Sequence, residues 1–171
     1  MAVFNVRVYG LLLNDANQLL VSDEYIRGGH YTKFPGGGLE FGEGTRDCLK
    51  REFMEELSLD VSVGEHFYTT DFFQMSAFSP EHQIIAIYYL VKALEDIKAP
   101  LRTKPFDFDE EQMKIYQQTG ETETFRFVDL GSVSEDDITL PIDKIAVRML
   151  IERFRGNNPT GDEISIVSKT I

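Results

Sequence analysis

The sequence predicts an α/β (α+β) fold in which helices pack on a mixed β-sheet. Strand-like segments lie on both sides of the first helix-like segment, and a second, amphipathic helix pattern comes near the end of the chain. Strands with helices between and after them are typical of a sheet covered by helices. With 171 residues, of which 42% are hydrophobic and 27% charged, the chain is predicted to form one domain that buries its own core.

The first half of the chain predicts a strand pair, a loop, a helix and a further strand. Residues 3–13 and 18–22 read as strands around a turn-forming sequence, a predicted hairpin. Residues 31–44 are glycine-rich and predict an ordered loop that leads into a helix. That helix is predicted over residues 46–57, a stretch of helix formers with Thr45 as its N-cap. β-like composition then returns at residues 61–68.

The second half contains the most apolar strand pattern of the chain. Residues 84–94 are continuous and rich in Ile and Tyr, which predicts a central strand buried on both faces. Residues 95–122 are a long, charged connection, and connections of this length are usually functional, so we expect a lid or substrate loop there.

The last elements are a strand, a helix and a tail. Residues 123–130 predict a strand, and residues 142–154, which follow Pro141, predict an amphipathic helix. Residues 157–171 are expected to form a loosely held tail, so that the domain spans residues 1–156.

The charge and the cysteine content restrict the class of partner and the compartment. A formal net charge of −12 and the lack of a basic patch predict that the protein does not bind nucleic acid. An acidic protein that handles phosphorylated substrates needs a divalent cation between its carboxylates and the phosphates.

Cys48, the single cysteine, is expected to be a buried hydrophobe. A single cysteine forms no intrachain disulfide, and no long apolar run is present, so we expect a cytoplasmic protein without a membrane anchor.

The first predicted helix carries three carboxylates on one face. Glu52, Glu55 and Glu56 are spaced i, i+3 and i+4, so their like charges destabilise the bare helix. Only Lys50 and Arg51 are near enough in sequence to offset them. A hard divalent cation such as Mg²⁺ prefers such oxygen ligands and would turn the repulsion into binding.

The same helix also has a side suited to packing on a sheet. Leu49, Phe53 and Leu57 lie about a quarter to a third of a turn round from the carboxylates. A solvated acidic helix face would show a similar composition, so the spacing of residues outside the helix has to decide between the two interpretations.

That spacing resembles the Nudix box. The box runs from Gly37 to Leu59, and only its last glycine is replaced, by Ser58, which puts a left-handed helix end on a serine. The matching residues are Gly37, Glu43, Arg51, Glu52, Phe53, Glu55, Glu56 and Leu59.

The resemblance to MutT-like Nudix hydrolases implies an α/β/α sandwich and a Mg²⁺-dependent pyrophosphohydrolase, with Mn²⁺ as an alternative ion. The substrate implied is a nucleoside triphosphate or a nucleoside diphosphate linked to another group. Carried over by position, the metal ligands are Glu52, Glu55, Glu56 and the Gly36 carbonyl, the catalytic residues are Glu55, Glu56 and Arg51, and Gly37 and Glu43 are structural.

The general base and the substrate-binding residues stay open at this point. The base candidates are Glu55, Glu56, Glu111, Glu121 and Glu123. Tyr25, Tyr31, Phe34, Phe72 and Phe73 have the chemistry to stack on a base but also that of core residues, and Lys33, Arg102 and Lys104 could meet distal phosphates. The three histidines are too scattered to suggest a zinc site.

Two other functions compete with hydrolysis. A catalytically silent Nudix-like domain that binds a nucleotide metabolite for regulation would not need the full carboxylate set. An mRNA-decapping relative would be expected to carry a basic surface. The resemblance is also compatible with a homodimer.

Overall fold

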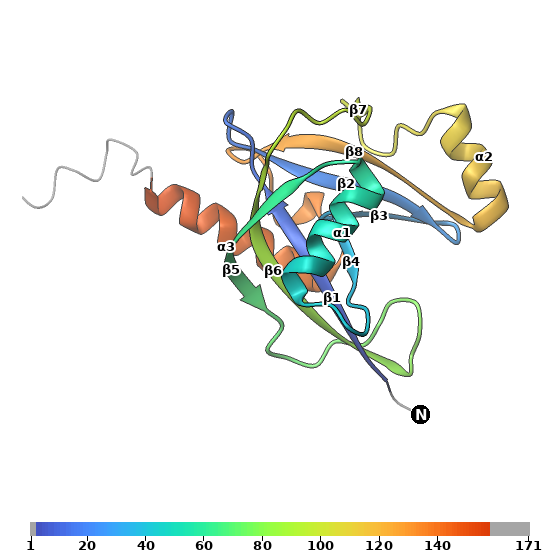
Figure 1. Ribbon diagram of the computed structural model, residues 1–171, viewed down its shortest axis with the longest axis horizontal. Coiled ribbons are helices and arrows are strands. Elements are labelled where there is room, and N and C mark those ends of the chain that lie inside the picture. The colour runs from blue at the N-terminus through green and yellow to red at the C-terminus, as the bar shows by residue number, and fades with distance from the viewer. Residues whose placement is uncertain (1–2, 158–171) are drawn as a thin grey trace, which may run out of the picture.

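The structure, a computed structural model, describes residues 3–157 (Figure 1). Within these residues the strands form two four-stranded sheets, with the orders β4-β1-β6-β5 and β3-β2-β8-β7. The elements are β1 (Val3–Leu12), β2 (Gln18–Ile26), β3 (Gly29–Lys33), β4 (Gly36–Gly38), α1 (Thr45–Leu57), β5 (Val61–Thr69), β6 (His82–Ala93), β7 (Leu101–Arg102), α2 (Glu110–Thr119), β8 (Glu121–Asp129), a 3-10 turn (Glu135–Asp137) and α3 (Pro141–Asn157).

Both sheets together form the central layer between α1 and α3, which lie on opposite sides of the strands in Figure 1. Alternate strand residues point to the two helices, because side chains of a strand alternate between its faces. Tyr88 of β6 is in the core beneath α3, and the next residue, Tyr89, is in the core beneath α1. The predicted α/β/α sandwich and the interior position of β6 are confirmed.

The predicted hairpin of the first two strands is wrong. The turn is present, since the Asn14 N–H donates to the Gln18 carbonyl at 3.0 Å, but the strands then separate into different sheets. A strand has only two edges, and those of β1 are taken by β4 and by β6, to which it is parallel. Between β1 and β2 only the Leu13–Leu19 bridge remains among the described residues.

The helix prediction over residues 46–57 is confirmed, but its N-cap is corrected. Gly44 occupies the N-cap position, and Thr45 is the first helical residue, with its hydroxyl 2.8 Å from the Tyr89 hydroxyl. At the other end Ser58 adopts the left-handed conformation, with φ 49°. The expected left-handed helix end is therefore formed by a serine, at the modest cost of placing a Cβ in that conformation.

The connections contain more regular structure than the sequence indicated. The predicted loop over residues 31–44 includes the end of β3 and all of β4. The predicted lid over residues 95–122 contains β7 and α2, which begins with a complete capping box between Asp109 and Gln112. The tail predicted from residue 157 lies, apart from Asn157 at the end of α3, outside the described residues.

The predicted strand over residues 61–68 corresponds to β5, the strand over residues 123–130 to β8, and the last helix to α3. None of the helices within residues 3–157 is long and apolar enough to cross a membrane.

Candidate active site

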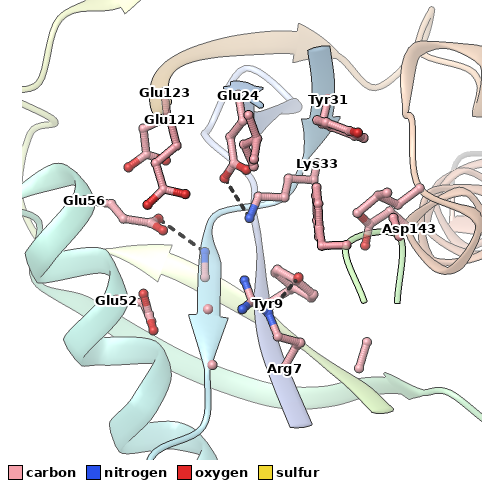
Figure 2. A pocket seen from close by; sticks show the side chains of 18 of the residues that line it. Arg7, Tyr9, Glu24, Tyr31, Lys33, Glu52, Glu56, Glu121, Glu123 and Asp143 are labelled. Atoms are coloured by element: carbon pink, nitrogen blue, oxygen red, sulfur yellow. Dashed lines mark hydrogen bonds and ion pairs between the residues drawn. The ribbon is translucent and has the colours of Figure 1, made fainter. Parts of the chain in front are cut away.

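A cleft of about 910 Å³ opens between the two sheets and α1. β1 and β6 contribute the floor, α1 and β8 contribute carboxylates, and α2 lines it from the side. Figure 2 shows Glu52 and Glu56 on one side of β4, and Arg7, Tyr9 and Lys33 on the other. The residues with charged or phenolic side chains that line the cleft are Arg7, Tyr9, Glu24, Arg27, Tyr31, Lys33, Glu52, Glu56, Tyr88, Glu121, Glu123 and Asp143.

The triglycine strand β4 lets the α1 carboxylates approach the backbone. Gly36 has φ +131°, and a Cβ at that position would overlap the Val8 carbonyl. A Cβ on Gly37 would overlap the carboxylate of Glu52. Glycine is therefore required at position 36 by its positive φ and by the β1 backbone, and a side chain at position 37 would displace the Glu52 carboxylate.

Arg51 is surrounded by acceptors. Its guanidinium donates to Glu43 at 2.8 Å, to both Glu52 and Glu55 at 3.0 Å, and to the Gly38 carbonyl at 3.1 Å. The hydrogen bonds from Arg51 hold the pKa of Glu43 at about 2. Arg51 thus joins the loop before α1 to two carboxylates of the helix.

Glu56 and Glu123 form a second carboxylate group with the opposite electrostatics. Glu56 accepts a hydrogen bond from the Gly36 N–H at 3.3 Å, and Glu123 accepts one from the Ser22 hydroxyl at 3.2 Å. Burial, followed by the charge of Glu123, raises the pKa of Glu56 well above its usual value. Burial, followed by the charge of Glu24, raises the pKa of Glu123 to about 7. Both groups therefore resist ionisation in the protein alone.

Lys33, a lysine that lines the same cleft, lowers the pKa of both acids, but burial and the neighbouring carboxylates outweigh it, and Lys33 is itself paired with Glu24. Lys33 contacts Glu24 at 2.6 Å, and their side chains are only 9% and 10% exposed. Burial by itself would lower the pKa of Lys33, but the nearby Tyr9 and Glu24 outweigh it and the pKa is raised. Lys33 remains protonated and bound to Glu24.

The α3 end of the cleft holds a buried acid. Asp143, in the first turn of α3, accepts a hydrogen bond from the Tyr88 hydroxyl. Burial raises its pKa to about 6, and its second oxygen, Oδ2, has no hydrogen-bond partner among the described residues. A buried acceptor without a partner favours the protonated form of this acid.

The sequence-derived acidic candidates separate into two groups. Gly36, Gly37, Glu52, Glu56, Glu121 and Glu123 line the cleft. Glu55 is 59% exposed and turned towards Arg51, whereas Glu43 and Glu111 are not part of the lining.

The candidates for substrate contacts also divide. Tyr31 and Lys33 line the cleft, but Phe34 is a fully buried core residue, Tyr25 stacks on Tyr116, and Arg102 is paired with Asp109 at 2.5 Å. Phe72, Phe73 and Lys104 are exposed away from the lining.

Arg7, Glu24 and Asp143 were missed by the sequence analysis. Each is a single charged residue in an otherwise ordinary segment. Strand pairing brings Arg7 and Glu24 to the cleft, and the packing of α3 on the sheets brings Asp143 there. The alternation Asn5, Arg7, Tyr9 on β1 was the one available signal, because it puts three polar side chains on one face of a strand.

Within residues 3–157, no three or more His, Cys, Asp or Glu side chains are arranged closely enough to hold a metal ion. The hydrogen bonds with Arg51 explain part of this, because they hold Glu52 and Glu55 towards the guanidinium. The carboxylates of the cleft nevertheless suit a hard cation, because such ions prefer oxygen ligands. Glu56 and Glu123 also repel each other when both are ionised, and a cation between them would relieve that repulsion.

A family model identifies the family of this chain, and solved structures show the same fold. The NUDIX domain family matches residues 3–149. No curated protein matches the sequence. Among solved structures, the solution structure of the ORF135 protein of E. coli has a TM-score of 0.63 at 16% identity, covering 93% of this chain and 96% of that chain.

Two further structures carry names that describe an activity. A UDP-X diphosphatase has a TM-score of 0.59 at 17% identity, with 92% of this chain and 66% of that chain covered. An ADP-ribose pyrophosphatase from Streptococcus suis has a TM-score of 0.55 at 16% identity, with 88% and 92% covered. At these identities the likeness shows a shared fold.

Proposed function

The chain belongs to the Nudix family of hydrolases, which act on phosphoric anhydride bonds, and from this premise we propose that it is a Mg²⁺-dependent pyrophosphohydrolase. Its proposed substrate is a nucleoside triphosphate or a nucleoside diphosphate linked to another group. The solved neighbours named for ADP-ribose and for UDP-X support this range of substrates without choosing within it.

The pairing of Glu56 with Glu123 is the observation that carries the proposal. Two carboxylates with raised pKa values lie in the cleft, and Lys33, the lysine beside them, is committed to Glu24. Such an arrangement costs folding free energy in the isolated protein. The cost is explained if the two carboxylates belong to a site that is completed by an external cation.

We assign the metal ligands to Glu52 and Glu56, with Glu55 and the Gly36 carbonyl as further donors, and we add Glu123 to the set. Glu52 and Glu55 would have to loosen their hydrogen bonds to Arg51 in order to contribute. When bound, Mg²⁺ or Mn²⁺ would neutralise the phosphoryl groups on either side of the cleaved linkage and lower the pKa of the attacking water.

The remaining chemistry falls to the side chains of the cleft. In hydrolysis, the water oxygen bonds to phosphorus, the bridging P–O bond breaks, and a carboxylate accepts the water proton. Glu56, Glu121 and Glu123 line the cleft and are candidates for that base, whereas Glu55, a further candidate, is outside the lining and bonded to Arg51. The sequence-based candidate Glu111 is not supported, because it is exposed on α2 outside the lining.

Arg51 is better described as a positioning residue than as a catalytic one. Its guanidinium contacts three carboxylates and a carbonyl and does not line the cleft. Five N–H groups in a rigid fork suit it to hold several carboxylates in fixed positions. Gly37 keeps its proposed structural role, because any side chain there would displace Glu52.

The test is turnover of a substrate panel by the purified protein. Nucleoside triphosphates, ADP-ribose and nucleotide sugars are incubated with Mg²⁺ and, separately, with excess chelator, and both products are identified. We expect cleavage of one substrate class that stops when the metal is chelated. If no compound is cleaved while an intact nucleotide still binds, the domain is a nucleotide-binding regulator instead.

A further inference from the structure

Arg7 lies in the cleft with most of its hydrogen-bonding capacity unused. It belongs to β1 and is paired in register with Gly38 of β4. Its Nε donates to the Tyr9 hydroxyl at 3.2 Å, and its guanidinium lies 5.8 Å from the centroid of the Tyr9 ring. Among residues 3–157, its two terminal NH₂ groups have no hydrogen-bond or ion-pair partner. Tyr9 therefore orients the guanidinium and leaves its fork open.

The other cations near the cleft differ from Arg7. Arg51 is occupied by Glu43, Glu52 and Glu55, and Lys33 is occupied by Glu24. Arg27, which also lines the cleft, is an exposed residue of the β2–β3 turn with φ 47°. Arg7 is half-buried on the floor, so it is the cation placed to meet an anion inside the cleft.

The triglycine strand β4 separates Arg7 from the carboxylates. Figure 2 shows β4 with Glu52 and Glu56 on one side and Arg7 on the other. Gly38 has no side chain, and a Cβ there would come within 3.8 Å of the Arg7 Nη1. At Gly38, therefore, β4 itself places no side chain between Arg7 and the cleft.

We propose that Arg7 forms an anion subsite across β4 from the carboxylates, and that this subsite takes the third phosphoryl group of a nucleoside triphosphate. The proposal rests on the proposed function, because two phosphoryl groups must flank the cleaved linkage at the carboxylate side. An arginine fork binds a phosphate through two parallel N–H···O bonds, whereas a neutral sugar offers it no matching charge. The subsite selects triphosphates over diphosphates that carry an uncharged group.

The kinetic test compares Arg7→Gln and Arg7→Lys with the wild-type protein. For the preferred nucleoside triphosphate, Arg7→Gln lowers kcat/KM by about 30-fold, mainly through KM, because charge-assisted hydrogen bonds are lost. Arg7→Lys recovers part of that loss, since the charge is restored without the fork. For ADP-ribose, Arg7→Gln changes kcat/KM by less than about threefold. Lys114→Gln, which removes the same charge from an exposed site of α2, leaves both substrates unaffected.

A binding measurement tests the subsite without turnover. Inorganic tripolyphosphate is titrated calorimetrically into each protein in the presence of EDTA, after circular dichroism has established that each variant is folded. We expect Arg7→Gln to weaken binding by about tenfold or more relative to the wild type and to Lys114→Gln.

The results separate this inference from the proposed function. Equal tripolyphosphate affinities of the wild type and Arg7→Gln, or no measurable binding by the wild type, overturn the subsite. If Arg7→Gln lowers kcat/KM equally for ADP-ribose and for the triphosphate, the proposed selection of triphosphates is overturned. A wild-type protein that hydrolyses nothing contradicts the proposed function, while the calorimetric comparison still decides whether Arg7 binds the anion.

Discussion

Carboxylates on helix α1 and in the loop before it lie in two different surroundings. Around Arg51, three carboxylates meet one guanidinium, and the pKa of Glu43 is lowered to about 2. One helical turn further on, Glu56 meets Glu123 across the cleft, and both pKa values are raised. The first group shares an arginine within the protein, whereas Glu56 and Glu123 have no ion-pair partner among the described residues. The contrast separates carboxylates that share a cation within the protein from carboxylates that have none, although Glu52 and Glu55 of the first group are also proposed metal donors.

The largest effect is expected from removing the charge of Glu56. Glu56→Gln keeps the shape and the hydrogen bond from the Gly36 N–H but loses a metal ligand, so kcat/KM with Mg²⁺ falls by about a thousandfold. The melting temperature of the metal-free protein stays the same or rises, because a repelled charge has been removed. Steady-state kinetics and thermal melts measure the two effects. An active Glu56→Gln protein would refute the assigned metal role.

Arg51→Gln breaks the other group and should act on stability as well as on turnover. The variant leaves Glu43, Glu52 and Glu55 without their cation, although the partial exposure of the site limits the loss. We expect the free energy of unfolding to fall by roughly 1–2 kcal/mol in urea titrations. Exposed Arg155→Gln, at the end of α3, provides a control with the same charge change. An unchanged unfolding curve would show that the Arg51 contacts do not stabilise the fold.

The two groups predict opposite responses to pH in the metal-free protein. A lowered pKa, as for Glu43, contributes stability that is lost only as the pH falls towards about 2. A raised pKa, as for Glu123, contributes stability at low pH that is lost as the pH rises from about 4.5 through about 7. In EDTA the melting temperature should therefore fall by about 5 °C between pH 5 and pH 8.

Glu123→Gln supplies the control for that pH response. The substitution removes one titrating group, so the fall in melting temperature between pH 5 and pH 8 should be smaller than in the wild type. It should not vanish, because burial also raises the pKa values of Glu56 and Asp143. Mg²⁺ should stabilise the wild-type protein more at pH 8 than at pH 5. A wild-type melting temperature that rises steadily from pH 5 to pH 8 in EDTA would contradict the raised pKa of this pair.

The smallest effect is expected at Glu55, which is 59% exposed and bonded to Arg51 at 3.0 Å. For Glu55→Gln we expect less than about 0.5 kcal/mol of lost stability, because exposed helical ion pairs contribute little. The loss of kcat should be about tenfold, well below that of Glu56→Gln. A loss equal to that of Glu56→Gln, measured under the same conditions, would make Glu55 an equal metal ligand.

The local part of the site could be predicted from the sequence. Positions three and four apart on a helix fix which carboxylates share a face, and Gly37 and Arg51 are within 20 residues of them. For the same reason the helix ended where predicted, with Ser58 in the left-handed conformation. These features depend on short-range geometry, which sequence spacing describes directly.

The non-local part could not be predicted in the same way. Glu123 reaches Glu56 only because β8 pairs with β2, and Arg7 reaches the cleft only because β4 and β6 occupy both edges of β1. The expected hairpin of the first two strands was wrong for the same reason: nothing in the composition of a strand states which neighbours its edges take. Residues that depend on strand pairing were therefore missed or left open.

The most direct test of the account is proton release on metal binding. Metal-free protein is titrated calorimetrically with Mn²⁺ at pH 7 in two buffers of different ionisation enthalpy, for the wild type and for Glu56→Gln. Because a metal displaces protons from acids of raised pKa, we predict that the wild type releases protons on binding and that Glu56→Gln binds weakly. Binding without proton release, or with the same affinity in Glu56→Gln, would contradict the claim that this carboxylate pair is reserved for a cation.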